Sequence, residues 1–161
     1  AYKNMNTQTR LVIAGELTKN NDYVNRIRRM AEGDERILFT DFVQGRVLEE
    51  LMSNCRVYVL PSDIEGMSIS LLEAMSCGVR CLVSDIEENV DVSGGYAASF
   101  PKGNIAMLQS CLERILGEDG RLHDREGQIA FIREKYSWDY AAAEHLRVYE
   151  QAAEKNKAGK N

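Results

Sequence analysis

The sequence predicts an α/β protein built on a doubly wound (Rossmann-like), mainly parallel sheet of about five strands with helices on both faces. Two observations support this class. Apolar runs of strand length alternate with helical patterns along all 161 residues. The runs are almost continuously apolar, which is typical of parallel strands that are buried on both faces. Such sheets bind ligands beyond the carboxyl ends of their strands. The length suits one domain, so we expect residues 1–161 to form a single unit with a frayed tail over 155–161.

Each expected element follows from its own pattern of apolar residues. The strands are expected at Leu11–Gly15, Ile37–Val43, Val57–Leu60, Cys81–Ser84 and Tyr96–Phe100. Apolar residues at helical spacing predict helices at Tyr23–Met30, Val47–Cys55, Met67–Ser76, Asn104–Leu116 and Trp138–Ala153, and a further stretch around Ile129–Ile132.

Composition excludes several classes of partner. The formal net charge is −5 and no basic block occurs, so the electrostatic footprint of nucleic-acid binding is missing. No apolar stretch is long enough to span a bilayer, so we expect no direct membrane segment. The cysteines, Cys55, Cys77, Cys81 and Cys111, lie in apolar patterns without metal-ligand spacing. Free thiols of a cytoplasmic protein explain them best, and we expect no metal.

The segment Pro61–Met75 carries the chemical signal. It joins the end of a strand to the start of a helix, where unpaired N–H groups and a partial positive charge suit a phosphate. Gly66 allows close approach of the backbone to a ligand. Glu65 and Glu73 are separated by on the order of 10 Å along the helix axis. A diphosphate at the helix start would have one carboxylate beside each of its two substituents, although solvated acids show the same spacing.

The surrounding residues favour the ligand-binding interpretation. The run Pro61–Val79 resembles the E-x7-E signature of family 4 retaining GT-B glycosyltransferases, P-S-x-x-E-G-[FM]-[GS]-[LI]-x-[LI]-[LI]-E-A-[MF]-A-x-G. Cys81–Asn89 resembles the next strand and loop, which read S-D-I-P-E-N in a subset. Tyr136-Ser137-Trp138 is similar to the F-S-W near the family's C-terminal end. The resemblance spans nearly the whole chain and is specific between Pro61 and Asn89.

The resemblance implies a role for each motif position. Glu65 would contact hydroxyls of the donor sugar and is the expected catalytic residue, while Glu73 would bind the ribose. Backbone N–H groups to the sugar and the phosphates would come from Gly66, Met67, Ser68 and Ile69. Residues expected at the base side or the cleft are Phe42, Val43 and Asn89.

The implied protein is the donor-binding half of a glycosyltransferase. It would transfer a hexose-type sugar from a nucleotide-diphospho-sugar to a glycan, lipid or similar acceptor, as in polysaccharide biosynthesis, with retention and without a metal. The acceptor-binding N-terminal domain is absent, and through it the longer protein could sit at the inner face of the cell membrane. The family's first strand and its Gly-rich turn, with an arginine and a lysine, are absent as well. The chain begins at what looks like the end of the following helix, Ala1–Arg10.

Two expectations follow from the missing segment. The chain alone should transfer no sugar, because a helix terminus supplies only about half a charge against a diphosphate. Two inner strand edges should be unpaired. The chain could close the gap, borrow a strand from a second copy in a strand-exchanged homodimer, or be marginally stable.

Two alternatives remain at this stage. In a receiver-like signalling domain, Asp63 and Lys102 would act as phosphoacceptor and lysine, but Glu16 stands alone before Leu17 where that fold needs an acidic pair. A non-catalytic nucleotide-sugar-binding module or scaffold is the other alternative. Trp138 and Tyr149 share a helical face and are expected in core packing rather than as a sugar platform.

Overall fold

The chain folds around two parallel sheets. The computed structural model describes residues 1–16, 22–117 and 123–158. Strands β1 (Leu11–Ile13) and β2 (Ile37–Phe39) form one sheet, and β3 (Tyr58–Leu60), β4 (Cys81–Ser84) and β5 (Ala98–Phe100) form the other in the order β3-β4-β5. Every pairing in both sheets is parallel. The predicted α/β class with parallel strands is confirmed.

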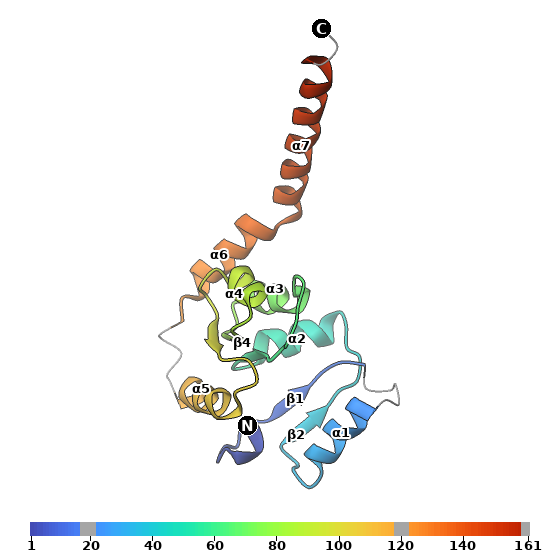
Figure 1. The fold of residues 1–161 in the computed structure, drawn as a ribbon. Helices are drawn as coiled ribbons and strands as arrows, with labels where there is room; N and C mark the ends of the chain where they lie inside the picture. Colours follow the sequence, from blue (N-terminus) through green and yellow to red (C-terminus); the bar gives the residue numbers. More distant parts are fainter. Residues whose placement is uncertain (17–21, 118–122, 159–161) are drawn as a thin grey trace.

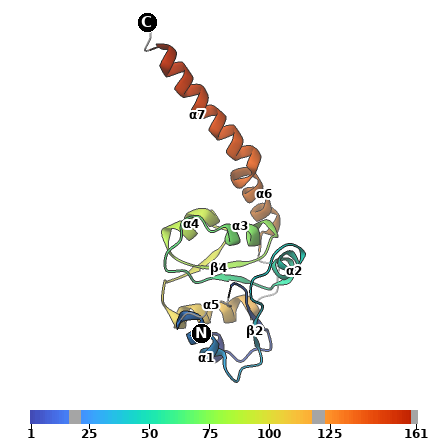
Figure 2. The same cartoon turned by 90° about the vertical axis from the view of Figure 1, so that its right-hand side faces the viewer.

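Helices cover both faces of the three-stranded sheet. The helices are α1 (Asp22–Ala31), α2 (Arg46–Asn54), α3 (Ile69–Ser76), α4 (Glu87–Ser93), α5 (Ile105–Gly117), α6 (Arg125–Tyr136) and α7 (Trp138–Ala158). Helices α3 and α4 lie on one side of β4 and α5 on the other, while α7 projects away from the rest of the chain (Figures 1 and 2).

Strand β4 lies at the centre of this packing. Its four residues are all buried. Alternate side chains of a strand point to opposite faces, and accordingly Cys81 and Val83 pack in a cluster with α3, α4 and α6, whereas Leu82 packs in a second cluster with β5 and α5. The continuous apolar run at this position predicted a strand that is buried on both faces, and β4 is buried in this way.

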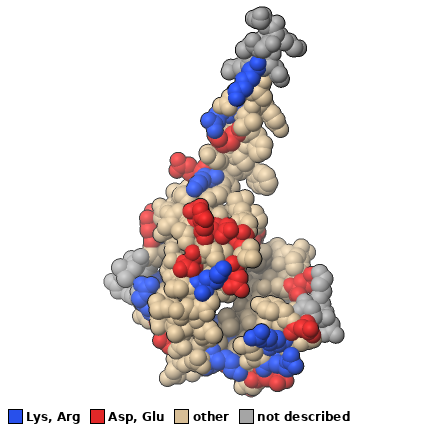
Figure 3. Space-filling model, viewed as in Figure 1, with Lys and Arg blue, Asp and Glu red and all other residues tan. Residues whose placement is uncertain are grey.

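The split between the sheets lies where two unpaired inner edges were expected. Strand β1 pairs with β2 and β3 pairs with β4, and no ladder among the described residues joins β1 to β3. Figure 3, in the orientation of Figure 1, shows the surface hollowed between the part that carries β1 and β2 and the part that carries β4. The two sheets are therefore separate hydrogen-bonded units.

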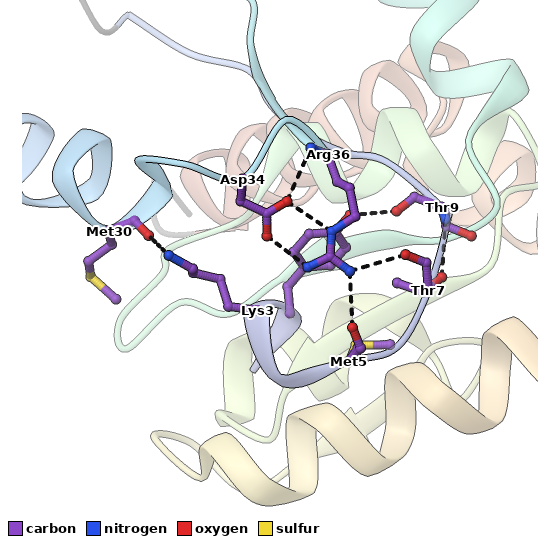
Figure 4. Close-up of polar contacts among 8 residues, drawn as sticks. Lys3, Met5, Thr7, Thr9, Met30, Asp34 and Arg36 are labelled. Carbon is purple, nitrogen blue, oxygen red and sulfur yellow. Dashed lines mark hydrogen bonds and ion pairs between the residues drawn. The ribbon is translucent and has the colours of Figure 1, made fainter.

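The N-terminal segment differs from its expectation. Instead of the end of a helix over Ala1–Arg10, it contains one short 3₁₀ turn, η1 (Tyr2–Asn4), followed by extended chain. The Arg36 guanidinium explains the difference, because it donates hydrogen bonds to the carbonyls of Met5 and Thr7 at 3.0 and 3.1 Å (Figure 4). Because a distant side chain donates to these carbonyls, the backbone here is stabilised in a non-helical conformation.

Asp34 fixes the guanidinium in turn. Its two carboxylate oxygens accept from Arg36 at 2.7 and 2.8 Å, a bidentate pair. These hydrogen bonds lower the pKa of the Asp34 carboxyl to about 2. Lys3 adds a bond from Nζ to the carbonyl of Met30 at the end of α1, so the start of the chain is tied to the α1–β2 connection (Figure 4).

The C-terminal helix also differs from its expectation. It extends past Ala153 to Ala158, because no glycine or proline interrupts it before Gly159. Residues 159–161 of the expected frayed tail lie outside the described residues. The expected core packing of Trp138 and Tyr149 is wrong, since these side chains are 90% and 67% exposed. Their shared face is real, but no other element of the described chain covers it.

Within the described ranges, no helix combines the length and the apolar character that a bilayer crossing requires.

Candidate functional site

The motif loop leads from β3 into a capped helix. Residues 61–68 connect β3 to α3, and the Ser68 hydroxyl accepts the N–H of Leu71 at 3.4 Å as N-cap. Ser68 itself is buried at 7% exposure. This cap makes α3 begin at Ile69, two positions after the expected start at Met67, because an N-cap residue has non-helical backbone angles. The helix N-terminus thus lies at the carboxyl end of the central strands, the ligand edge of a parallel sheet.

Hydroxyl groups connect the start of α3 to strand β3. Ser70 Oγ lies 3.2 Å from Ser68 Oγ and 2.7 Å from the Tyr58 hydroxyl of β3. Burial raises the pKa of the Tyr58 phenol, and the charges of Glu65 and Glu73 act in the same direction. Tyr58 therefore stays a neutral hydroxyl that can donate in this network at neutral pH.

The two glutamates differ in their surroundings. Glu65 is half-buried, and its Oε1 accepts a hydrogen bond from Ser62 Oγ at 2.6 Å. This distance is typical of a hydroxyl that donates to a carboxylate. Glu73 lies in the second turn of α3 with its side chain exposed. One carboxylate is therefore held before the helix start, and the other extends into solvent farther along the helix. Because α3 begins at Ile69, Glu73 lies about one turn into the helix, closer to its start than the expected two turns.

The backbone between the glutamates is open to a ligand. Apart from Gly66 and its two chain neighbours, no residue has a heavy atom within 4 Å of the position that a Cβ on Gly66 would take. The flanking side chains of Met67 and Ile69 are 55% and 59% exposed. Because the first N–H groups of an α-helix have no partners within the helix, this stretch offers donors to an anion.

The ends of β4 and β5 meet the motif loop. The Asp85 carboxylate accepts the N–H of Lys102 at 2.8 Å, and Lys102 Nζ donates to the carbonyl of Asp63 at 3.3 Å. Asp63 and Lys102, the pair of the receiver-like alternative, are thus neighbours, but the lysine binds the main chain of Asp63. The acidic position of that alternative at Leu17 lies outside the described residues.

The expected base-side and cleft residues lie in different places. Phe42 is 67% exposed and Val43 half-buried, in the segment that follows β2. Asp41 just before them has a positive φ of 54°, and its carbonyl accepts the N–H of Gly15 at 2.9 Å. Asn89 is only 1% exposed, so it lies beneath the surface of the cleft rather than on it.

The site is an open surface. A cavity of about 650 Å³ lies between α1 and β2, and one of about 160 Å³ lies at the amino ends of β4 and β5. Neither is lined by a residue of the motif. Carboxylates gather over α3 and α4, and cations over α1 (Figure 3). Among the described residues, no three His, Cys, Asp or Glu side chains are grouped to hold a metal ion, and all four cysteines are free thiols.

Comparison with known proteins decides the family. The model of the family "Glycosyl transferases group 1" matches residues 1–118, which include both sheets and the motif. The chain belongs to this family. A relative is the serotype-specific mannosyltransferase WbdA of Escherichia coli, 28% identical over 131 residues, 79% of this chain and 16% of that protein.

Two solved structures share the fold of this chain. Sucrose-phosphate synthase of Thermosynechococcus elongatus superposes with a TM-score of 0.78 at 18% identity, covering 91% of this chain and 39% of that one. Anabaena HepE in complex with UDP gives a TM-score of 0.74 at 16% identity, covering 98% and 43%. The chain thus spans less than half the length of each of these proteins.

Several residues of the site escaped the sequence interpretation. Tyr58, Ser62, Ser70 and Ser84 support the motif through hydroxyl groups, and Lys102 ties the three strand ends together. The P-S of the motif and the S-D of the next strand contain two of these serines. Nothing in the local pattern of the sequence announces the other contacts, because they join residues that are far apart in the chain.

Proposed function

We propose that this chain is the donor-binding half of a retaining glycosyltransferase that transfers a hexose-type sugar from a nucleotide-diphospho-sugar. The observation that carries the proposal is the placement of Glu65 and Glu73 on either side of the open N-terminus of α3. The carboxylates accept hydrogen bonds from hydroxyl groups and repel phosphate, so the hydroxyls of the sugar and the ribose are their natural partners. The diphosphate takes the helix N-terminus between them.

Each proposed role uses a specific group. Glu65 binds hydroxyls of the donor sugar next to the reacting carbon and Glu73 binds the ribose. Backbone N–H groups of residues 66–69 bind the sugar and the phosphates, and developing charge on the leaving diphosphate is stabilised by such fixed dipoles. Phe42 offers an exposed ring to the base, with Val43 beside it. No residue group described here calls for a metal in this scheme.

The relatives support the substrate class. WbdA is by name a mannosyltransferase, and HepE was solved with UDP, the nucleotide part of a donor. We extend to this chain a nucleotide-diphospho-sugar donor and a glycan, lipid or similar acceptor, as in bacterial surface polysaccharide synthesis. The cytoplasm, where such donors are made, is the proposed location.

For the chain by itself we propose donor binding without transfer. Carboxylates outnumber cations on the surface over α3 and α4 (Figure 3), and a diphosphate leaving group needs cations to stabilise its developing charge. The unpaired edges of β1 and β3 invite a strand from the acceptor-domain side of a longer protein or from a second copy in a strand-exchanged homodimer. A compact, stable monomer in light scattering would contradict the exchange, and sugar transfer by the purified chain would contradict its inactivity.

The donor assignment is tested by ligand-observed NMR against UDP-, GDP- and ADP-sugars. We expect binding of one nucleotide class that disappears in Glu73→Ala. The matched control is Glu134→Ala, an exposed glutamate on α6, which should bind like the unmodified chain. Binding that survives Glu73→Ala, or no binding at millimolar ligand by the folded chain, would overturn the assignment.

A further inference from the structure

A chain of hydrogen bonds runs from the core to the motif carboxylate. Asn89 Nδ2 donates to Ser84 Oγ at 3.1 Å and to the Ser84 carbonyl at 3.3 Å. Ser84 Oγ donates to the carbonyl of Ser62 at 2.5 Å. Ser62 Oγ donates to Glu65 Oε1 at 2.6 Å. Three segments of the chain, the start of α4, the end of β4 and the motif loop, are linked in this order.

The donors of this relay all point the same way. The Ser84 proton is used on the Ser62 carbonyl, so its oxygen can accept from the Asn89 amide. The Ser62 hydroxyl donates its proton to the hydrogen bond with the Glu65 carboxylate, because an ionised carboxylate can accept hydrogen bonds but cannot donate them. The bonds therefore fix one oxygen of Glu65 and leave the other for a ligand hydroxyl. The bonds from Asn89 and Ser84 hold the main chain of Ser62, and the Ser62 hydroxyl in turn holds Glu65, so the relay acts by position.

Burial makes the inner end of the relay rigid. Ser84 and Asn89 are each 1% exposed, while Ser62 and Glu65 are half-buried. Asn89 Oδ1 is buried without a hydrogen-bond partner among the described residues. A buried acceptor without a partner is costly, and an apolar side chain at this position would avoid the cost. Packing alone does not account for an asparagine here, whereas holding Ser84 does.

We infer that Ser84 and Asn89 are positioning residues of the donor-sugar subsite, which orient Glu65 through Ser62 without touching the ligand. The inference rests on the proposed function and names the part of the donor that it concerns. Because Glu65 is assigned to the sugar and Glu73 to the ribose, loss of the relay weakens recognition of the sugar and leaves recognition of the nucleotide intact.

The relay has a signature in the free chain. The Cδ resonance of Glu65 in ¹³C-detected NMR should move in Ser62→Ala and in Ser84→Ala. It should stay in place in the control Ser99→Ala, an exposed serine on the neighbouring strand β5. Ser62→Thr keeps a hydroxyl and should restore the original position. If the Glu65 resonance in Ser84→Ala coincides with that in Ser99→Ala, the relay is overturned, whether or not a donor binds.

The subsite role is tested by comparing affinities. The probes are UDP-glucose and GDP-mannose, each paired with its free diphosphate, UDP or GDP. Ser62→Ala should lose about tenfold in affinity for the bound nucleotide-sugar, as one charge-assisted hydrogen bond is worth, and Ser84→Ala about fivefold, as one neutral hydrogen bond is worth. Each variant should lose less than twofold in affinity for the nucleotide. An equal loss for both ligands would show a merely structural role and overturn the inference. A relay seen in the free chain together with no binding of either ligand would overturn the proposed function instead.

Discussion

The two sheets of this chain differ in how fully their strands are buried. In the three-stranded sheet, β4 is buried along its whole length between α3 and α5. In the two-stranded sheet, Val12 and Leu38 at the middle of their strands are each 38% exposed. A cavity of about 650 Å³ separates α1 from β2. The half that carries the motif and β3 to β5 thus has a complete core and is called the complete half. The half that carries β1 and β2 leaves apolar surface exposed and is called the thinner half.

This difference shows how the site depends on the fold. The motif loop, α3 and the relay to Glu65 all belong to the complete half, so the Glu65 carboxylate is held in position in the chain as it stands. Phe42 and Val43 belong to the thinner half, and their distance from the motif depends on how the two sheets are held together. Sugar and ribose recognition should therefore be more robust than recognition of the base.

The greatest loss of stability should follow from removing a large side chain in the core of the complete half. Leu82→Ala removes a side chain with 0% exposure and should lower the free energy of unfolding by about 2–5 kcal/mol. Leu38→Ala, in the thinner sheet, should cost less than about half as much, because its side chain is already partly in water. Urea unfolding followed by circular dichroism measures both. Equal losses would contradict the difference between the sheets.

A smaller effect is expected where α6 closes the complete half. Gln128 has 0% exposure, and its amide donates to the carbonyls of Met75 and Val79 at 2.9 and 3.0 Å. Gln128→Ala removes one donor from each carbonyl, although the Met75 carbonyl keeps the N–H of Gly78 at 2.9 Å, and should cost about 1–2 kcal/mol of unfolding free energy. Gln109→Ala, whose bond to Glu113 is exposed, is the control and should be nearly neutral. A neutral Gln128→Ala would show that the Gln128 amide does not contribute to holding α6.

The smallest effect concerns the thinner half and depends on pH. The pKa of Asp34 is lowered from 3.8 to about 2 by hydrogen bonds from Arg36. A carboxyl whose pKa is lower in the folded state adds stability above its ordinary pKa, and this stability is lost as the pH falls through the folded value. The melting temperature of the chain should therefore fall more steeply between pH 4 and pH 2 (about the two pKa values) than that of Asp34→Asn. Parallel curves for the two proteins would contradict the clamp on the N-terminal segment.

Sequence alone predicted the parallel α/β fold, because β4 and its neighbours carry apolar runs that only a sheet covered on both faces explains. It put Glu65 before the start of α3 and Glu73 on the helix, but it began the helix at Met67 instead of Ile69. It missed α4, since Glu87–Ser93 offers two glutamates and few apolar residues, and it misjudged Ala1–Arg10. In the latter case a distant side chain, Arg36, decides the local path. The relay through Ser84 was beyond local patterns for the same reason.

The central claim is that the complete half binds the donor. The most direct test is a ¹H–¹⁵N correlation spectrum of the labelled chain during titration with UDP-glucose and with GDP-mannose. One of these donors should shift the amide signals of residues 62–69 and Glu73, with smaller shifts at Ser84–Asn89 through the relay. Shifts confined to α1 and β2, around the cavity between them, would contradict the claim and move the binding site to the other half of the molecule.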